Sequence, residues 1–287
     1  AADENYFYIP DTKGLYKYDK NWNLVAKRVQ SDSDPLFPNP KLANHFGDID
    51  VWNGRIYTGN EKFEYGRGFN IAISVYDAET LEWIEDIPWC AESGQVEVSG
   101  LAVDREKNMI WMSDWVDSRY VYGYSLETGK YYTKMQCRPM PYWTQGIFIC
   151  DGKMLFAADD GESTYHIADN IYIADITQVP YSGLKDGTEV VRDTPFSVKL
   201  DKNGKVVTRT GKIAAGAMGG RLELFREMKD FRRAGEIEGL CIDPTTDDLL
   251  VLNNRGTQII LGMSQGPFKE EGYTKEIHEV YIYEKVK

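Results

Sequence analysis

Residues 239–254 read GLCIDPTTDDLLVLNN. A glycine begins a short apolar strand, a polar turn follows, and a second apolar strand ends in two asparagines. Two apolar strands joined by such a turn predict a β-hairpin. The same unit recurs as GDIDVWNGRIYTGN (47–60), GLAVDREKNMIWMSDW (100–115) and GIFICDGKMLFAADDG (146–161). The chain is therefore built from repeats of one hairpin.

A second hairpin, rich in aromatic residues, accompanies most of these units. Its copies are GLYKYDKNWNLVAKRV (14–29), SVYDAETLEWIEDI (74–87) and YVYGYSLETGKYYTKM (120–135), and its first strand also recurs at 170–176 and 279–286. Together the two hairpins form an antiparallel meander of roughly 45 to 50 residues, the length of one propeller blade. We therefore expect an all-β chain whose residues 1–287 form a single β-propeller domain. About five four-stranded blades are expected, with six as the alternative.

The segment from 177 to 235 fits the repeat least well. It contains KLDKNGKVV, which predicts a hairpin, and then RLELFREMKDFRR. In that second run Leu222, Phe225, Met228 and Phe231 recur at helical spacing. This spacing predicts a short amphipathic helix around 221–233, inserted on one rim of the propeller.

Composition excludes several classes of protein. The chain has 42% hydrophobic residues and a net charge of −12, which exclude a disordered protein and disfavour binding to nucleic acid. No apolar stretch reaches the roughly 18 to 20 residues of a membrane helix, so no membrane insertion is expected. Four cysteines form no C-x-x-C pair, which excludes a zinc ribbon, and the oxidation state of Cys90 and Cys137 stays open.

The start AADENYF suits a cleaved precursor and predicts a bacterial protein that is secreted, periplasmic or attached to the cell envelope.

The repeat also carries a family resemblance. Its pattern of glycine, alternating apolar residues and aspartate, followed by a strand that ends in acidic residues or Asn, resembles the calcium-dependent lactonase, strictosidine-synthase-like and NHL-type propellers. The phrases TQGIFICDGKMLF (144–156) and EIEGLCIDPTTDDLLVLNN (236–254) resemble glutaminyl cyclotransferase and the SdiA-regulated-like propellers. These families share a fold and differ in activity, so the resemblance implies architecture more than chemistry. Its lactonase branch implies a calcium ion at the central channel.

Polar residues at the start of each blade are the candidate site. In a propeller the first strand of each blade lies nearest the axis, so its entrance faces the channel mouth. Aligning the repeats on their glycines places seven polar residues there: His45, Asp48, Glu97, Ser99, Gln145, Glu236 and Glu238. Such oxygen donors suit Ca²⁺, for which we predict Glu97 and Glu238 as ligands. Asp48, Ser99, Gln145 and Glu236 are predicted to bind a small molecule, with Trp143 as a stacking surface. The alternative is that these residues hydrogen-bond the backbone of the next blade and hold channel water.

Three functions stay open at this stage. The favoured one is a propeller that binds a small polar molecule or a cation at the channel mouth without chemistry. The second is a calcium-dependent hydrolase or lactonase, in which His45 acts as general base while Glu97 and Glu238 hold the ion. The third is a cyclotransferase-like enzyme that uses Glu238 or Glu97 as a proton shuttle. The chain offers no convincing nucleophile and only three histidines, which favours binding.

Overall fold

The computed structural model describes residues 1–31, 33, 35–115, 117–159, 168–177, 189–193, 199–207, 210–214, 217–231, 235–255 and 277–286. The regular secondary structure of these residues is β-strand apart from one turn of 3-10 helix, η1 (Ala91–Ser93). No helix among them is long and apolar enough to cross a membrane. The prediction of an all-β, propeller-like fold is confirmed at this level.

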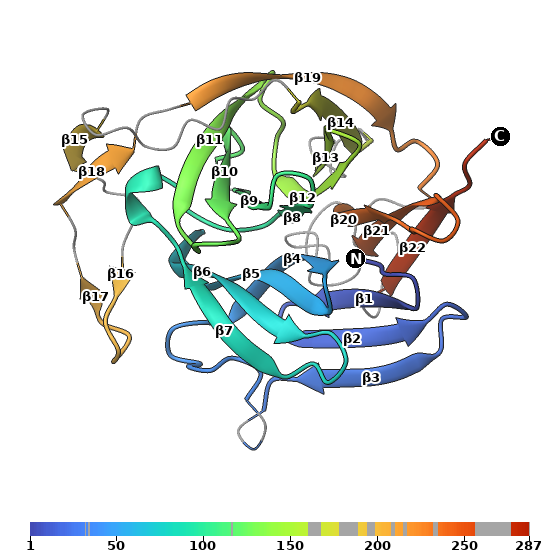
Figure 1. Cartoon of the computed structure of the whole chain (residues 1–287), viewed down its shortest axis with the longest axis horizontal. Helices are drawn as coiled ribbons and strands as arrows, with labels where there is room; N and C mark the ends of the chain where they lie inside the picture. The colour runs from blue at the N-terminus through green and yellow to red at the C-terminus, as the bar shows by residue number, and fades with distance from the viewer. Residues whose placement is uncertain are drawn as a thin grey trace, which may run out of the picture.

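The strands form successive antiparallel meanders arranged around a common centre (Figure 1). Three meanders lie in the N-terminal half: β1 (Tyr6–Asp11), β2 (Gly14–Asp19) and β3 (Leu24–Val29); β4 (His45–Trp52), β5 (Arg55–Glu64), β6 (Arg67–Asp77) and β7 (Trp83–Pro88); and β8 (Leu101–Asp104), β9 (Met109–Ser113), β10 (Tyr120–Ser125) and β11 (Tyr131–Arg138).

The C-terminal half continues the pattern. Its meanders are β12 (Thr144–Cys150), β13 (Lys153–Ala158), β14 (Asn170–Asp175) and β19 (Ala217–Glu227), followed by β20 (Glu236–Ile242), β21 (Leu249–Arg255) and β22 (Ile277–Tyr283). Two small pairs lie at the periphery, β15 (Glu189–Asp193) with β18 (Thr210–Ala214) and β16 (Lys199–Leu200) with β17 (Val206–Val207). The predicted hairpin in KLDKNGKVV is confirmed by the second pair.

β19 corrects one prediction. The first part of this strand runs parallel to β11, and the second part pairs antiparallel with β14, so it links two meanders at their outer edge (Figure 1). The helix predicted around 221–233 is therefore wrong over the length of β19. Leu222 and Met228 are buried, as the helical pattern required, but Phe225 is 53% exposed. Pairing with β11 along its first part and with β14 along its second part gives the backbone of β19 long-range hydrogen-bond partners, which outweigh the local apolar periodicity.

The predicted hairpin turns are confirmed. Asn53 and Gly54 both have positive φ angles (51° and 71°), as do Asp151 and Gly152 (48° and 67°). Two successive residues with positive φ are what a tight hairpin turn of type I′ requires, and Asn-Gly and Asp-Gly supply them at low strain. These turns fix the register of β4 with β5 and of β12 with β13.

The glycines that open the four repeats lie where the first strands approach one another most closely: Gly47, Gly100, Gly146 and Gly239. A Cβ atom on Gly47 would lie 2.4 Å from the carbonyl oxygen of Ser99, and one on Gly146 would lie 2.7 Å from the carbonyl oxygen of Glu238. No side chain fits at such distances without moving backbone. The repeated glycine is therefore explained by packing at the centre of the molecule.

The hydrophobic core lies between adjacent meanders. One cluster packs Tyr57 and Ile73 of the second meander against Val103 and Met112 of the third, and three similar clusters fill the other junctions. This confirms the expectation that each unit buries its faces against its neighbours. All four cysteines are free thiols.

Candidate functional site

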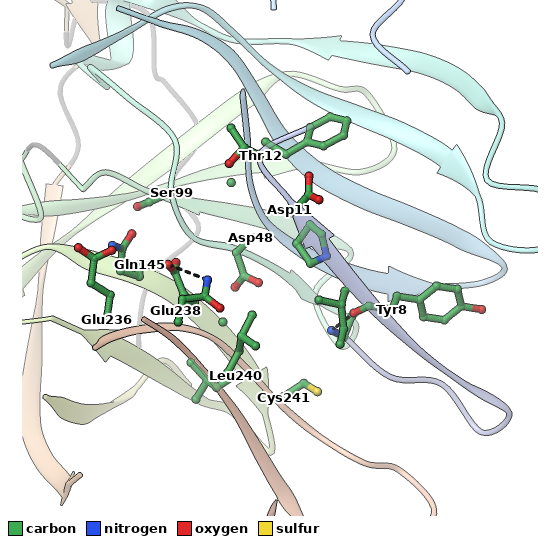
Figure 2. A pocket seen from close by; sticks show the side chains of 18 of the residues that line it. Tyr8, Asp11, Thr12, Asp48, Ser99, Gln145, Glu236, Glu238, Leu240 and Cys241 are labelled. Carbon is green, nitrogen blue, oxygen red and sulfur yellow. Dashed lines mark hydrogen bonds between the residues drawn. The ribbon is translucent and has the colours of Figure 1, made fainter. Parts of the chain in front are cut away.

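A cavity of about 360 Å³ opens at the centre of the molecule. Its walls come from the inner strands β1, β4, β12 and β20 and from the residues that precede β8. All seven polar residues predicted for the channel mouth line it: His45, Asp48, Glu97, Ser99, Gln145, Glu236 and Glu238. Figure 2 shows five of these seven, all but His45 and Glu97, labelled around one space.

The predicted stacking residue Trp143 is not among the described residues that line the cavity. Its ring instead stacks on Trp115, with centroids 5.9 Å apart and an angle of 19° between the planes. Trp115 itself lines the cavity, together with Phe63 and Trp22. Aromatic rings therefore contribute to the cavity wall, and Trp143 contacts one of them without lining the cavity itself.

The polar part of the lining is acidic. Five carboxyl groups contribute to it: Asp11, Asp48, Glu97, Glu236 and Glu238. No lysine or arginine occurs among the described residues of the wall. The amino group of Ala1 also lines the cavity, where it donates a hydrogen bond to the carbonyl oxygen of Tyr8 (2.9 Å).

Glu238 is held by an amide from the neighbouring strand. Asn254 donates from Nδ2 to Oε1 of Glu238 (3.1 Å), and Oδ1 of Asn254 lies 2.6 Å from Nδ1 of His278. Burial raises the pKa of Glu238 to about 7, although the hydrogen bond from Asn254 opposes the shift. Sequence reasoning missed Asn254 because only first strands were aligned, whereas Asn254 lies in β21, the second strand of its meander.

His45 contacts an acidic residue that the sequence analysis also missed. Its Nδ1 atom lies 3.1 Å from Oε1 of Glu61, and its ring packs against Phe63. The side chain of His45 is 29% exposed, and this exposed part faces the cavity. Burial lowers the pKa of His45 to about 4, so the imidazole is neutral at neutral pH. Glu61 stands opposite His45 in the register of the β4–β5 hairpin, and aligning that hairpin would have found it.

Glu61 and Glu97 form a buried pair of carboxyl groups. The exposed fractions of the two residues are 0% and 2%. One oxygen of each is fixed by the backbone: Val98 donates its N–H to Oε2 of Glu61 (3.0 Å), and Trp115 donates to Oε2 of Glu97 (2.5 Å). Burial raises the pKa of both side chains, and the charge of Glu61 raises that of Glu97 further.

Two of the predicted residues also hold the inner strands together. Asp48 accepts hydrogen bonds from the backbone N–H groups of Ile49 (2.8 Å) and Ile147 (3.3 Å), and Ser99 donates to the carbonyl oxygen of Thr144 (2.5 Å). The bond from Ser99 reaches the next unit, whereas Ile49 belongs to the same strand as Asp48 and Ile147 lies two units further along the chain. Burial raises the pKa of Asp48 to about 8. Asp48 and Ser99 therefore have structural roles in addition to lining the cavity.

Comparison with known proteins adds little to this geometry. No protein-family model matches the sequence, and no curated protein is significantly similar to it. Among solved structures, the chain is similar to the crystal structure of glutaminyl cyclase from Myxococcus xanthus, with 7% sequence identity and a TM-score of 0.48. The match covers 95% of this chain and 83% of that chain. This likeness concerns the path of the backbone.

Proposed function

We propose that the protein binds a small molecule carrying a positively charged nitrogen in the central cavity. The observation that carries the proposal is the charge of the wall, in which five carboxyl groups meet no lysine or arginine among the described residues. Aromatic rings of Phe63 and Trp115 in the same wall would pack against the rest of the ligand and attract its charge.

The acidic wall gives such a ligand a physical advantage. Burial makes these carboxyl groups resist ionisation, as the raised pKa values of Asp48 and Glu238 indicate, although the N-terminal ammonium group partly opposes the shift at Asp48. A bound cation would restore the charged form, so binding should release protons near neutral pH. A neutral ligand of the same shape would not gain the free energy of attraction to the ionised carboxyl groups.

The test is a set of three ligands with one shape and different charge. Benzylamine, benzyl alcohol and benzoate are titrated calorimetrically into the full chain at pH 7.5. We expect benzylamine to bind at least tenfold more tightly than benzyl alcohol, with no binding of benzoate. Equal affinity for the amine and the alcohol would overturn the proposal.

A pair of variants locates the binding. Glu238→Gln should weaken benzylamine binding at least fivefold, because it removes one cavity carboxylate and keeps the acceptor for Asn254. Glu106→Gln changes an exposed carboxylate outside the cavity wall and should leave binding unchanged. Equal weakening in both variants would indicate binding to the acidic surface in general.

A second candidate function is proton-transfer catalysis of the hydrolase, lactonase or cyclotransferase type. It is favoured by the presence of a neutral imidazole, His45, and a carboxyl group with a pKa of about 7, Glu238, in one cavity. Glu238 titrates near neutral pH, as effective general acid–base catalysis requires, and the neutral His45 has a nitrogen that accepts a proton. A panel of lactones, esters and N-terminal glutaminyl peptides, assayed with and without Ca²⁺, tests it. Turnover lost in both His45→Gln and Glu238→Gln would support this candidate, and no turnover on any substrate would contradict it.

We also infer that the successive meanders are the five blades of one propeller. In the described residues the first and last meanders have three strands and the others have four, with β19 completing the fourth meander. The hydrophobic clusters that join each meander to the next support this count. An electron-density map that showed a sixth meander inserted around the centre would contradict it.

A further inference from the structure

One wall of the cavity brings together donor atoms of the kind that bind a metal ion. His45, Glu61 and Glu97 each offer one ligand atom, and these atoms all lie within 4.8 Å of one another. It is the one group of three or more His, Cys, Asp or Glu side chains with this geometry among the described residues, and Glu238 is not part of it. Calcium held by Glu97 and Glu238 together thus remains a prediction from the sequence.

The spacing of the donors suits a single ion. Zinc binds imidazole nitrogen and carboxylate oxygen at roughly 2.0–2.2 Å, so adjacent ligands of a tetrahedral ion lie about 3.3–3.6 Å apart. Nδ1 of His45 and Oε1 of Glu61 are 3.1 Å apart, slightly closer than this. The ligand atom of Glu97 lies within 4.8 Å of both, so a movement of its carboxylate towards them would complete a three-donor face.

The two carboxylates are oriented by groups behind them. The backbone N–H groups of Val98 and Trp115 each hold one oxygen of a carboxylate, which leaves the other oxygen for the shared point. Outer partners of this kind fix the direction of metal ligands. Gly68 makes room for the arrangement, since a Cβ atom there would lie 1.9 Å from Oε2 of Glu61 and 3.0 Å from Cα of Glu97.

Trp115, whose backbone N–H holds Glu97, carries a further polar group at this wall. Its indole nitrogen is buried and has no hydrogen-bond partner in the described structure. A buried donor without an acceptor is costly, so an acceptor atom bound at this nitrogen would be favourable. Two adjacent buried carboxylates likewise need a positive charge or a shared proton.

We propose that His45, Glu61 and Glu97 bind a divalent transition-metal ion such as Zn²⁺ or Mn²⁺, whose remaining positions face the cavity. The imidazole nitrogen favours these ions over Ca²⁺, which prefers oxygen ligands only. Since His45 and Glu97 both line the cavity, a small molecule bound there could complete the coordination. This inference goes beyond the proposed binding of an organic cation and does not depend on it.

The test measures metal binding directly. The full chain is stripped with chelator and titrated calorimetrically with ZnCl₂, MnCl₂ and CaCl₂. We expect one Zn²⁺ or Mn²⁺ per chain, with Ca²⁺ at least tenfold weaker, and at least tenfold weaker Zn²⁺ binding in His45→Gln and Glu61→Gln. Substitution with Co²⁺ should give a visible absorption band that shifts in His45→Gln. Absence of stoichiometric binding, or wild-type affinity in His45→Gln, would overturn the proposal.

Further variants keep the two proposals distinguishable. Glu238→Gln should weaken benzylamine binding and leave Zn²⁺ affinity within threefold of wild type, whereas Glu61→Gln should weaken Zn²⁺. If Glu61→Gln does not fold, His45→Gln decides the question, because His45 is partly exposed to the cavity. A loss of Zn²⁺ affinity in Glu238→Gln equal to that in His45→Gln would contradict the assignment of ligands. Glu106→Gln serves again as the surface control.

Discussion

The side chain of Glu238 is buried, and burial disfavours its ionised form. Its pKa is raised from an ordinary value of 4.5 to about 7, so the folded chain holds this proton more tightly than the unfolded chain. The resulting stability is present below about pH 4.5 and is lost as the pH rises through 7. We therefore expect Glu238→Gln to increase the free energy of unfolding by about 1–3 kcal/mol at pH 8 and to change it little at pH 4.5.

Urea denaturation of both chains at the two pH values measures this effect. The solutions must contain chelator and no amine, because a bound cation would stabilise the carboxylate. Glu106→Gln provides the control, since its carboxylate is exposed. A stabilisation of the Glu238 variant that is equal at pH 4.5 and pH 8 would contradict the assigned cause.

The contribution of His45 to stability should depend on pH in the opposite direction. Its pKa is lowered from 6.5 to about 4 by burial, so the unfolded chain binds the proton first as the pH falls. Its contribution to stability is therefore present above about pH 6.5 and is lost as the pH falls towards 4. An NMR titration in which the ring signals of His45 stay those of a neutral imidazole down to about pH 5 would confirm this. A midpoint near 6.5 would contradict it.

At this scale the sequence predicted the position of the site better than its chemistry. Aligning the repeats on their glycines placed seven polar residues at one opening, and all seven line the cavity. Glu61 and Asn254 could not be found in this way, because both lie in second strands: Asn254 lines the cavity itself, and Glu61 lies beside His45, which lines it. Their roles depend on register, which an alignment of first strands does not contain. The functional roles of the seven residues stay predictions.

At the level of the strand, the inner glycines are the most constrained positions. A Cβ atom on Gly47 would press against the backbone of Ser99 and Val98. We expect Gly47→Ala to lower the melting temperature by several degrees, corresponding to about 2–4 kcal/mol, because backbone must move. Gly66→Asn is the matched control: nothing lies within 4 Å of its Cβ position, and asparagine tolerates its positive φ. Equal shifts in the two variants would show that inner packing is not the cause.

The pair of Asp50 and Arg105 joins β4 to the turn that follows β8. Asp50 is 1% exposed and accepts hydrogen bonds from the backbone N–H of Val103 (2.9 Å) and from Arg105 (2.8 Å). Removing the carboxylate leaves the buried N–H of Val103 without its acceptor and leaves Arg105 with the carbonyl oxygen of Val51. We expect Asp50→Ala to destabilise the fold by about 2–4 kcal/mol in chemical denaturation, and a change below 0.5 kcal/mol would contradict this.

The elements differ in how far their sequence predicted them. Strands joined by Asn-Gly and Asp-Gly turns were predicted correctly, because their turn residues and their apolar alternation agree. β19 was predicted as a helix because its apolar spacing fits both structures, and its pairing with β11 and β14 is a long-range effect. β1 was missed as an inner strand, since its tyrosines and proline do not resemble the glycine-led repeat.

For the whole molecule, shared hydrophobic clusters predict cooperative unfolding. Each cluster takes residues from more than one meander, so no single meander keeps its core when its neighbour unfolds. We expect thermal melts followed by far-ultraviolet and near-ultraviolet circular dichroism to coincide. Leu222→Ala, which removes a buried side chain of β19, should lower both midpoints equally. Two separated transitions would indicate units that unfold independently.

The overall architecture was the most predictable feature, because it rests on a pattern repeated along the chain and not on any single segment. The number of blades and the export of the protein remain predictions. The net charge of −12 does not show where acidic side chains gather, so it could not predict the five carboxyl groups of the central cavity.

The close approach of the inner glycines also affects the central cavity. Gly47 lies against the backbone before β8, Gly100 against that of β12, Gly146 against that of β20, and Gly239 against the side chain of Asp48. The inner strands are therefore in close contact at this level, in the part of the chain that the structure describes. A Cβ atom at any of the four positions would push a neighbouring strand or the carboxylate of Asp48 aside, so the shape of the cavity depends on these glycines.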